Sequence, residues 1–292
     1  MQRLIIVVFT SLMMCMPGAW AAERGALFKL SGSGHVMYLF GTIHVGLPEY
    51  FPLEPRISAA LAEASAVALE IDPLADPAAL ARAVATHTMR DASTGAAPAG
   101  LQPRLDKALR AAYVDPAMVA NLKPWLIASV LTINEFALQG GRAELSVDLH
   151  LATQAHERKI PVIELESITA QFAMFNSMNP AQQWEFLDDT VSMLESGREK
   201  DEVVQIMRAW SRADRTALDA IAAEAEQDTS VSGKFVQKVL LEARNGPMAD
   251  KLAALLAKQD KVVAAVGVLH LVGKLSVPAQ LRARGITVER IY

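Results

Sequence analysis

The segment "YLFGTIHVG", residues 38–46, is an apolar run that leads into Gly41, Thr42 and His44. A second segment, "VVAAVGVLHLVG" at residues 262–273, repeats the arrangement, because His270 again stands three positions after a glycine. Short apolar runs bounded by glycine are typical of buried strands. Both histidines are therefore predicted to lie just beyond the end of a strand, where a simple turn residue would suffice.

Acidic residues end two further predicted strands, "VALEID" at 67–72 and "IPVIELE" at 160–166. The stretch before the first of them, 56–66, has helical spacing, and strand, helix and strand in succession predict a parallel, right-handed crossover. The chain is thus predicted to be an α/β protein with a mixed, largely parallel central sheet flanked by helices.

The remaining patterns predict helical insertions and a closing unit within a single domain over residues 22–292. We expect no second domain joined by a linker. The expected elements are a hairpin of strands 27–30 and 35–40, a helical insertion over 73–141, a helix from Ser146 to about Arg158, helices from Asn179 to about Gln259, and a final strand, helix and strand at 261–271, 276–285 and 286–292.

The first 21 residues are predicted to be a secretory signal peptide. Arg3 supplies the positive start, residues 4–16 the uncharged apolar region, and Ala19-Trp20-Ala21 a small-x-small cleavage site. An uncleaved anchor is the alternative. We therefore expect an exported protein, periplasmic or secreted, that meets a membrane only transiently through this segment.

Composition excludes several classes of function. The 292 residues carry a formal net charge of −4 and no stripe rich in lysine and arginine, so nucleic acid is not an expected partner. The single cysteine, Cys15, lies inside the signal segment. Thiol chemistry is therefore excluded for the remainder, and any metal ion must be held by His, Asp or Glu.

The strand ends together predict a site. The carboxyl ends of parallel strands share one edge of a sheet, which brings His44, Glu70, His270 and either Glu164 or Glu166 toward a common crevice. Two imidazoles and one or two carboxylates suit a divalent metal ion that keeps open positions for water and substrate. Such an ion activates water for hydrolysis. Thr42 is placed to orient His44 through its hydroxyl group.

Each of these residues also has a simpler interpretation. Chance alone predicts roughly 0.3 matches to the spacing G-x-x-H, and three occur, of which His35 belongs to a Ser/Gly turn. A lone histidine or strand-end glutamate is commonly a hydrogen-bonding or ion-pairing group. Asp72 shares a strand face with Glu70, and Glu164 with Glu166, so the pattern leaves both choices open.

At these residues the sequence resembles the TraB/GumN family, which is related to the Tiki proteases. The likeness spans nearly the whole chain after the signal segment. It rests on "YLFGTIHVG", the glutamate of "VALEID", "KPW" at 123–125, "SVDLHLATQAHERKIPVIELES" at 146–167, "EARN" at 242–245 and "VGVLHLVGKLSVPAQLRARGITVERI" at the end.

The resemblance implies a fold related to the erythromycin-esterase and ChaN-like proteins, and metal-dependent proteolysis as in the Tiki members. It implies that His44, His270 and Glu70 hold the metal and that Glu166 is a weaker candidate. It also implies that Arg244 stabilises developing negative charge or binds a substrate carboxylate, and that Asp148 supports a ligand or begins a helix. One departure is "GPMADKL" after Asn245, which lacks an aromatic residue.

The sequence therefore predicts an exported metal-dependent hydrolase, a peptidase that uses metal-activated water, with Glu70 or Glu166 as ligand or general base and Arg244 as a further catalytic group. The expected ion is Mn, Co or Zn, and the expected partner is a peptide or protein substrate. The alternative is a non-catalytic protein that sequesters a peptide, metal or cofactor in the same crevice. A third possibility, hydrolysis of a non-peptide ester, is supported by analogy of fold alone.

Overall fold

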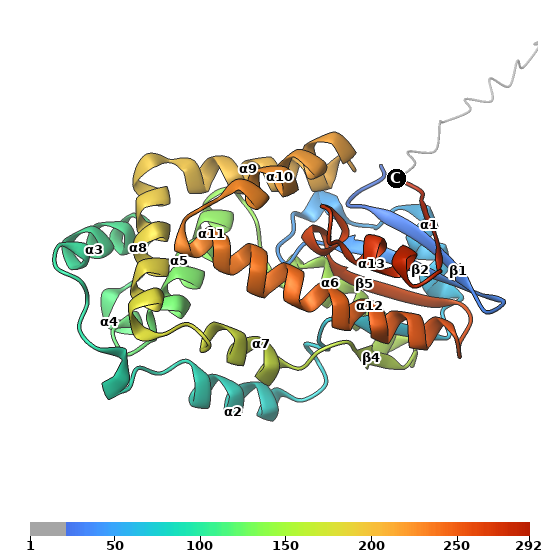
Figure 1. The fold of residues 1–292 in the computed structure, drawn as a ribbon, viewed down its shortest axis with the longest axis horizontal. Helices are drawn as coiled ribbons and strands as arrows, with labels where there is room; N and C mark the ends of the chain where they lie inside the picture. Colours follow the sequence, from blue (N-terminus) through green and yellow to red (C-terminus); the bar gives the residue numbers. More distant parts are fainter. Residues whose placement is uncertain (1–21) are drawn as a thin grey trace, which may run out of the picture.

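The computed structural model describes residues 22–292 (Figure 1). The predicted signal peptide, residues 1–21, lies outside the described residues and stays a prediction. Of the described helices, none is both long enough and apolar enough to cross a membrane.

A six-stranded sheet forms the centre of the fold. Its strand order is β4-β3-β5-β2-β1-β6, in which β4, β3, β5 and β2 run parallel while β1 pairs antiparallel with both of its neighbours. This confirms the mixed, largely parallel sheet predicted from the apolar runs. The strands are β1 (Leu27–Gly32), β2 (His35–Thr42), β3 (Ala66–Leu69), β4 (Val162–Glu164), β5 (Val262–Gly267) and β6 (Thr287–Arg290).

The two glycine-histidine segments lie side by side because β2 pairs directly with β5. In the register of this pair, Thr42 stands opposite Gly267. Both strands end at this point, so the chain turns after each at the same edge of the sheet. A β-carbon on Gly41 would lie only 2.9 Å from the side chain of Val268, which shows how closely the two turns pack.

The second turn differs from the prediction. The apolar run was expected to be a strand over 261–271, but β5 ends at Gly267 and residues Val268–Leu271 form a 3₁₀-helix. Residues three apart in a 3₁₀-helix lie above one another. His270 therefore lies over Gly267 instead of continuing along the strand direction. The spacing of three residues between the glycine and the histidine corresponds to one turn of this helix.

Four helices pack their apolar sides on the sheet. Ile57, Leu151, Leu252 and Leu281, one from each helix, are fully buried in this core. Of these helices, α12 and α13 lie in front of the sheet in Figure 1. The four are α1 (Pro55–Ala62), α6 (Val147–Glu157), α12 (Ala243–Leu256) and α13 (Val277–Ala283).

The predicted helical insertions are confirmed, and part of them builds a second core. Trp125 and Trp184 are buried in this core with apolar side chains of α3, α5 and α8, helices that lie together in Figure 1. Two further inserted helices, α9 and α10, instead place Val203, Trp210 and Leu218 in the core on the sheet. α7 lies between the two predicted helical ranges and was not predicted. The helices besides the four named above are α2 (Pro77–His87), α3 (Leu101–Ala111), α4 (Pro116–Val119), α5 (Pro124–Leu138), α7 (Ile168–Phe175), α8 (Pro180–Ser196), α9 (Arg198–Ser211), α10 (Arg215–Gln227), α11 (Val231–Phe235) and the π-helix Val236–Glu242 that continues into α12.

The packing of the two turns predicts different effects for two alanine substitutions. Gly41→Ala should lower the free energy of unfolding by about 1–3 kcal/mol, because the new methyl group would overlap the stiff side chain of Val268. Gly267→Ala should stay within about 1 kcal/mol of wild type, because its β-carbon would lie 3.4 Å or more from its neighbours. Urea denaturation measures both, and equal losses would contradict this packing.

Candidate functional site

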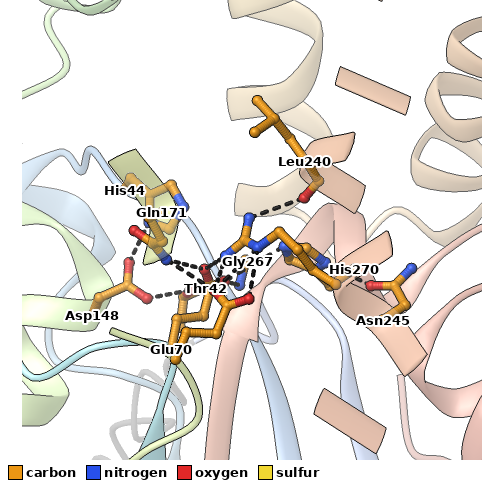
Figure 2. Close-up of polar contacts among 11 residues, drawn as sticks. Thr42, His44, Glu70, Asp148, Gln171, Leu240, Asn245, Gly267 and His270 are labelled. Carbon is orange, nitrogen blue, oxygen red and sulfur yellow. Dashed lines mark hydrogen bonds and ion pairs between the residues drawn. The ribbon is translucent and has the colours of Figure 1, made fainter. Parts of the chain in front are cut away.

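His44 is the exposed histidine of the cluster shown in Figure 2, with 70% of its side chain accessible to solvent. Its ring Nδ1 donates to Oδ2 of Asp148 at 2.9 Å, and the Thr42 hydroxyl donates to the other carboxylate oxygen at 2.6 Å. Asp148 stands in the first turn of α6, whose N-terminus is capped by the Ser146 side chain. The helix start thus orients His44 through one ring nitrogen and leaves Nε2 free.

His270 lies at the buried side of the same cluster, with only 4% of its side chain exposed. Its Nδ1 is 2.6 Å from Oδ1 of Asn245, which belongs to α12. Its Nε2 faces Glu70 and lies 3.8 Å from Oε1 of that carboxylate. The two histidines that the turns bring together are therefore both held through Nδ1.

Glu70 lies between the two histidines, one residue beyond the end of β3. Its Oε1 accepts the backbone N–H of Gly267 at 2.7 Å, and its Oε2 accepts from Arg244. A β-carbon on Gly267 would lie 3.4 Å from Glu70 Oε1, 3.4 Å from His44 Nε2 and 3.7 Å from the His270 ring. The absence of a side chain at this glycine therefore leaves one small space that all three groups border.

Glu166 and Arg244 complete the cluster. The backbone N–H of Glu166 donates to the Glu70 carbonyl at 2.8 Å, so the chain after β4 stays beside the chain after β3. Arg244 donates from Nε to both oxygens of Glu166 at 3.0 Å, from Nη2 to both glutamates, and from Nη1 to the Leu240 carbonyl at 2.9 Å. Most of its donors are thus engaged within the protein, which favours a role in holding the two carboxylates together.

The choices left open by the strand faces are resolved by the geometry. Glu166 joins the cluster, whereas Glu164 is exposed and accepts the backbone N–H of Asp72 at 2.9 Å. The Asp72 carboxylate accepts from His156 at 2.7 Å. Asp72 and Glu164 thus make local contacts outside the cluster.

Two side chains in the cluster were not predicted. Asn245 contacts His270, and Gln171 of α7 donates to Glu166 at 3.1 Å and to Glu70 at 3.4 Å. Asn245 belongs to the "EARN" segment, but nothing in its spacing indicates a contact with a histidine 25 residues away. Gln171 carries no pattern in the sequence that separates it from a surface helix residue.

The "KPW" segment anchors the helix that carries Gln171. α7 has no fully buried residue of its own. Its last residue, Phe175, stacks on Trp125 with ring centroids 4.6 Å apart. The next residue, Asn176, accepts from Lys123 at 2.9 Å and from Trp125 at 3.3 Å, and donates to His87 of α2. Lys123 and Trp125 therefore act at a distance from the cluster, by fixing α7 beside it.

The charged groups and burial of the cluster determine which of its side chains are protonated at neutral pH. Asp148 raises the pKa of His44 to about 9, although 70% of that side chain is exposed and water screens part of the attraction. Burial lowers the pKa of His270 to about 4. Burial alone would raise the pKa of the Glu70 carboxyl. The positive charges of His270, His44 and Arg244, together with the hydrogen bond from the Gly267 N–H, have the larger effect and lower this pKa to about 2. At neutral pH the buried pair is therefore a carboxylate beside a neutral imidazole.

The donor chemistry of the cluster fits a divalent metal ion. His44 Nε2, His270 Nε2 and Glu70 Oε1 are nitrogen and oxygen ligands of the kinds that zinc and similar ions bind. Within residues 22–292, no three His, Cys, Asp or Glu side chains are arranged closely enough to hold an ion as they stand. An ion would therefore bind here only after these side chains moved closer together.

Two surface cavities, of about 480 and 370 Å³, lie elsewhere. The larger is lined by Trp184 and Asp188 and the smaller by Tyr50 and Arg208, and neither is lined by a residue of the cluster. They lack its combination of histidines and carboxylates, and we place the candidate site at the cluster.

The sequence matches a family of known proteins over the segments that carry these residues. The model of the TraB/PrgY/gumN family matches residues 26–290, which includes both glycine-histidine turns. The chain belongs to the TraB/PrgY/gumN family. The resemblance predicted from the motifs is thereby confirmed over residues 26–290.

Relatives of this family member include the uncharacterized protein YbaP of Escherichia coli (strain K12). The two chains are 29% identical over 273 residues, covering 90% of this chain and 96% of the relative. The protein of the same name from Shigella flexneri shows the same identity and coverage. No solved structure matches. The comparisons thus establish the family and assign no activity.

The contact between His44 and Asp148 predicts a shifted titration. Asp148→Asn should lower the pKa of His44 from about 9 toward 6.5, because the neutral amide no longer stabilises the imidazolium. Since the folded pKa is the higher one, the pair stabilises the fold fully below pH 6.5 and loses this effect as the pH rises through 9.

Long-range ¹H–¹⁵N NMR of the imidazole nitrogens measures this titration in wild type and variant. The stability difference between them should be larger at pH 6 than at pH 10. An unchanged midpoint for His44 in Asp148→Asn would show that the carboxylate does not control this histidine.

Proposed function

We propose that this family member is an exported metal-dependent hydrolase that cleaves peptide bonds. The observation that carries the proposal is the convergence of His44, His270 and Glu70 on the open space at Gly267. Both histidines are engaged through Nδ1, so each would bind an ion through Nε2. Metal-binding histidines are commonly oriented by such a contact to the second ring nitrogen. In His44, Nε2 must first lose its proton, because the pKa of that side chain is about 9.

His44 Nε2, His270 Nε2 and Glu70 Oε1 are the proposed ligands, and Mn, Co or Zn the proposed ion. A divalent ion held there supplies Lewis acidity, which polarises a carbonyl group and lowers the pKa of water. The separation of 3.8 Å between His270 Nε2 and Glu70 Oε1 is within the roughly 4 Å expected of two ligands with bonds near 2 Å.

The carboxylates have different proposed roles. Glu70 is ionised at neutral pH and faces the histidines, so it can serve as a ligand or accept a proton from the attacking water. Glu166 faces Arg244, which contacts both of its oxygens. We assign Glu166 and Arg244 to holding Glu70 in place, with Glu166 the weaker candidate for general base.

The substrate class and location complete the proposal. A peptide or protein is the proposed substrate, on the resemblance to Tiki proteases, and the formal net charge of −4 does not favour nucleic acid. Residues 1–21 carry the proposed export signal, which makes the protein periplasmic or secreted.

Metal titration tests the ligands directly. Isothermal calorimetry of the purified protein with Mn²⁺, Co²⁺ or Zn²⁺ should show one site, and His44→Ala and His270→Ala should lose it. Gly267→Ala should also lose it while remaining folded, because its methyl group would fill the space that the three groups border.

His156→Ala is the matched control, because this histidine contacts Asp72 outside the cluster and should not affect binding. Equal metal content in wild type, His44→Ala and His270→Ala would overturn the metal assignment.

A peptide library digested in the presence of each ion tests the reaction. Cleavage should stop with a chelator and in His270→Ala. Glu70→Gln should reduce the rate by about 10²–10⁴-fold, the range for loss of a general base, and Glu166→Gln by less. Mass spectrometry of the products gives both the rate and the cleavage position. Tight peptide binding without turnover would instead identify a sequestering protein.

A further inference from the structure

The hydrogen bonds of Asn245 determine which end of its side-chain amide faces His270. Asn245 is 3% exposed, and its Nδ2 donates to the carbonyl oxygen of Leu275 at 2.9 Å. A carbonyl oxygen only accepts, so the atom that meets Leu275 must be the amide nitrogen. The amide oxygen is therefore the atom that lies 2.6 Å from Nδ1 of His270.

This orientation determines which ring nitrogen of His270 carries the proton. The oxygen of Asn245 accepts and cannot donate, so the contact requires a proton on Nδ1. A neutral imidazole has one N–H, and Nε2 is then left with a lone pair that faces Oε1 of Glu70 at 3.8 Å. This is the nitrogen that the proposed ion requires.

The other histidine is also held through Nδ1, but by a different kind of group. His44 is exposed and donates from Nδ1 to a charged carboxylate, that of Asp148, whereas His270 is buried against a neutral amide. A carboxylate in place of this amide would add a third negative charge beside Glu70 and Glu166. The amide of Asn245 orients the ring without adding charge to a cluster that already contains two glutamates and one arginine.

The position of Asn245 in α12 supports a specific role. Asparagine has a poor helix propensity, yet it occupies the first turn of this helix, directly after the π-helix Val236–Glu242. π-helical segments are often found at functional sites. The consecutive residues Arg244 and Asn245 contact different partners. Arg244 binds the two glutamates, and Asn245 contacts His270 (Figure 2).

We propose that Asn245 is a positioning residue, which fixes His270 as the Nδ1–H tautomer and directs the Nε2 lone pair toward the site. The consequence for metal affinity rests on the proposed function. The tautomer itself does not, because the contacts that fix it lie within the protein.

The tautomer of His270 in the metal-free protein is the first readout. Long-range ¹H–¹⁵N NMR should show a protonated Nδ1 and an unprotonated Nε2 at neutral pH in wild type. In Asn245→Leu the acceptor is absent, and the proton should move toward Nε2, where it can be donated to Glu70. Asn245→Asp retains an oxygen acceptor and should retain the Nδ1–H tautomer.

Metal affinity is the second readout. Mn²⁺ affinity should fall about 10–100-fold in Asn245→Leu, the range for loss of a residue that orients a metal ligand. It should fall less in Asn245→Asp, which keeps the acceptor for His270 but loses the donor to the Leu275 carbonyl. Asn134→Leu makes the same substitution at a partly buried asparagine of α5 whose amide donates to the Val130 carbonyl of the same helix, and should leave the His270 tautomer unchanged.

The outcomes separate the two proposals. A protonated Nε2 in wild type, or an unchanged tautomer in Asn245→Leu, would overturn the positioning role. If Asn245→Leu does not fold, loss of the Nδ1–H tautomer in Asn245→Asp would overturn it equally. A wild-type protein that holds the tautomer but binds no ion supports the positioning role and contradicts the proposed function alone.

Discussion

The parallel pairing of β2 with β5 is the interaction on which the site depends. These strands come from opposite ends of the described chain, and their register places Thr42 opposite Gly267. Both turns that follow must then share one edge, and their close packing leaves little freedom for either. A shift of the register by one residue would turn each strand's side chains to the other face. It would also separate His44 from His270.

Charge balance is the second constraint on this edge. Glu70 and Glu166 are brought together by adjacent strands, and two buried carboxylates would repel each other without a partner. Arg244 lies within contact of both and is itself held by the Leu240 carbonyl of the π-helix. The helical part of the protein thus contributes to the sheet edge by supplying a cation there. Removing one partner of such a buried group leaves the others uncompensated.

The parts of the fold and of the site that depend on local patterns of apolar and polar residues could be predicted from the sequence. Apolar runs predicted the strands, and the rule for parallel sheets predicted that His44, Glu70 and His270 meet. The 3₁₀-helix Val268–Leu271 was predicted as strand because its residues are as apolar as those of β5. Asn245 and Gln171 lie on helices that reach the cluster through long-range packing, and no local periodicity encodes such an approach. The choice of Glu166 over Glu164 required the path of the chain beyond β4.

The two histidines of the cluster differ strongly in their exposure to solvent. His44 has 70% of its side chain in contact with solvent, whereas His270 has 4%. A small molecule that approaches the cluster from solvent therefore meets His44 before His270. The two halves of one sequence repeat thus lie in different surroundings, one hydrated and one dry.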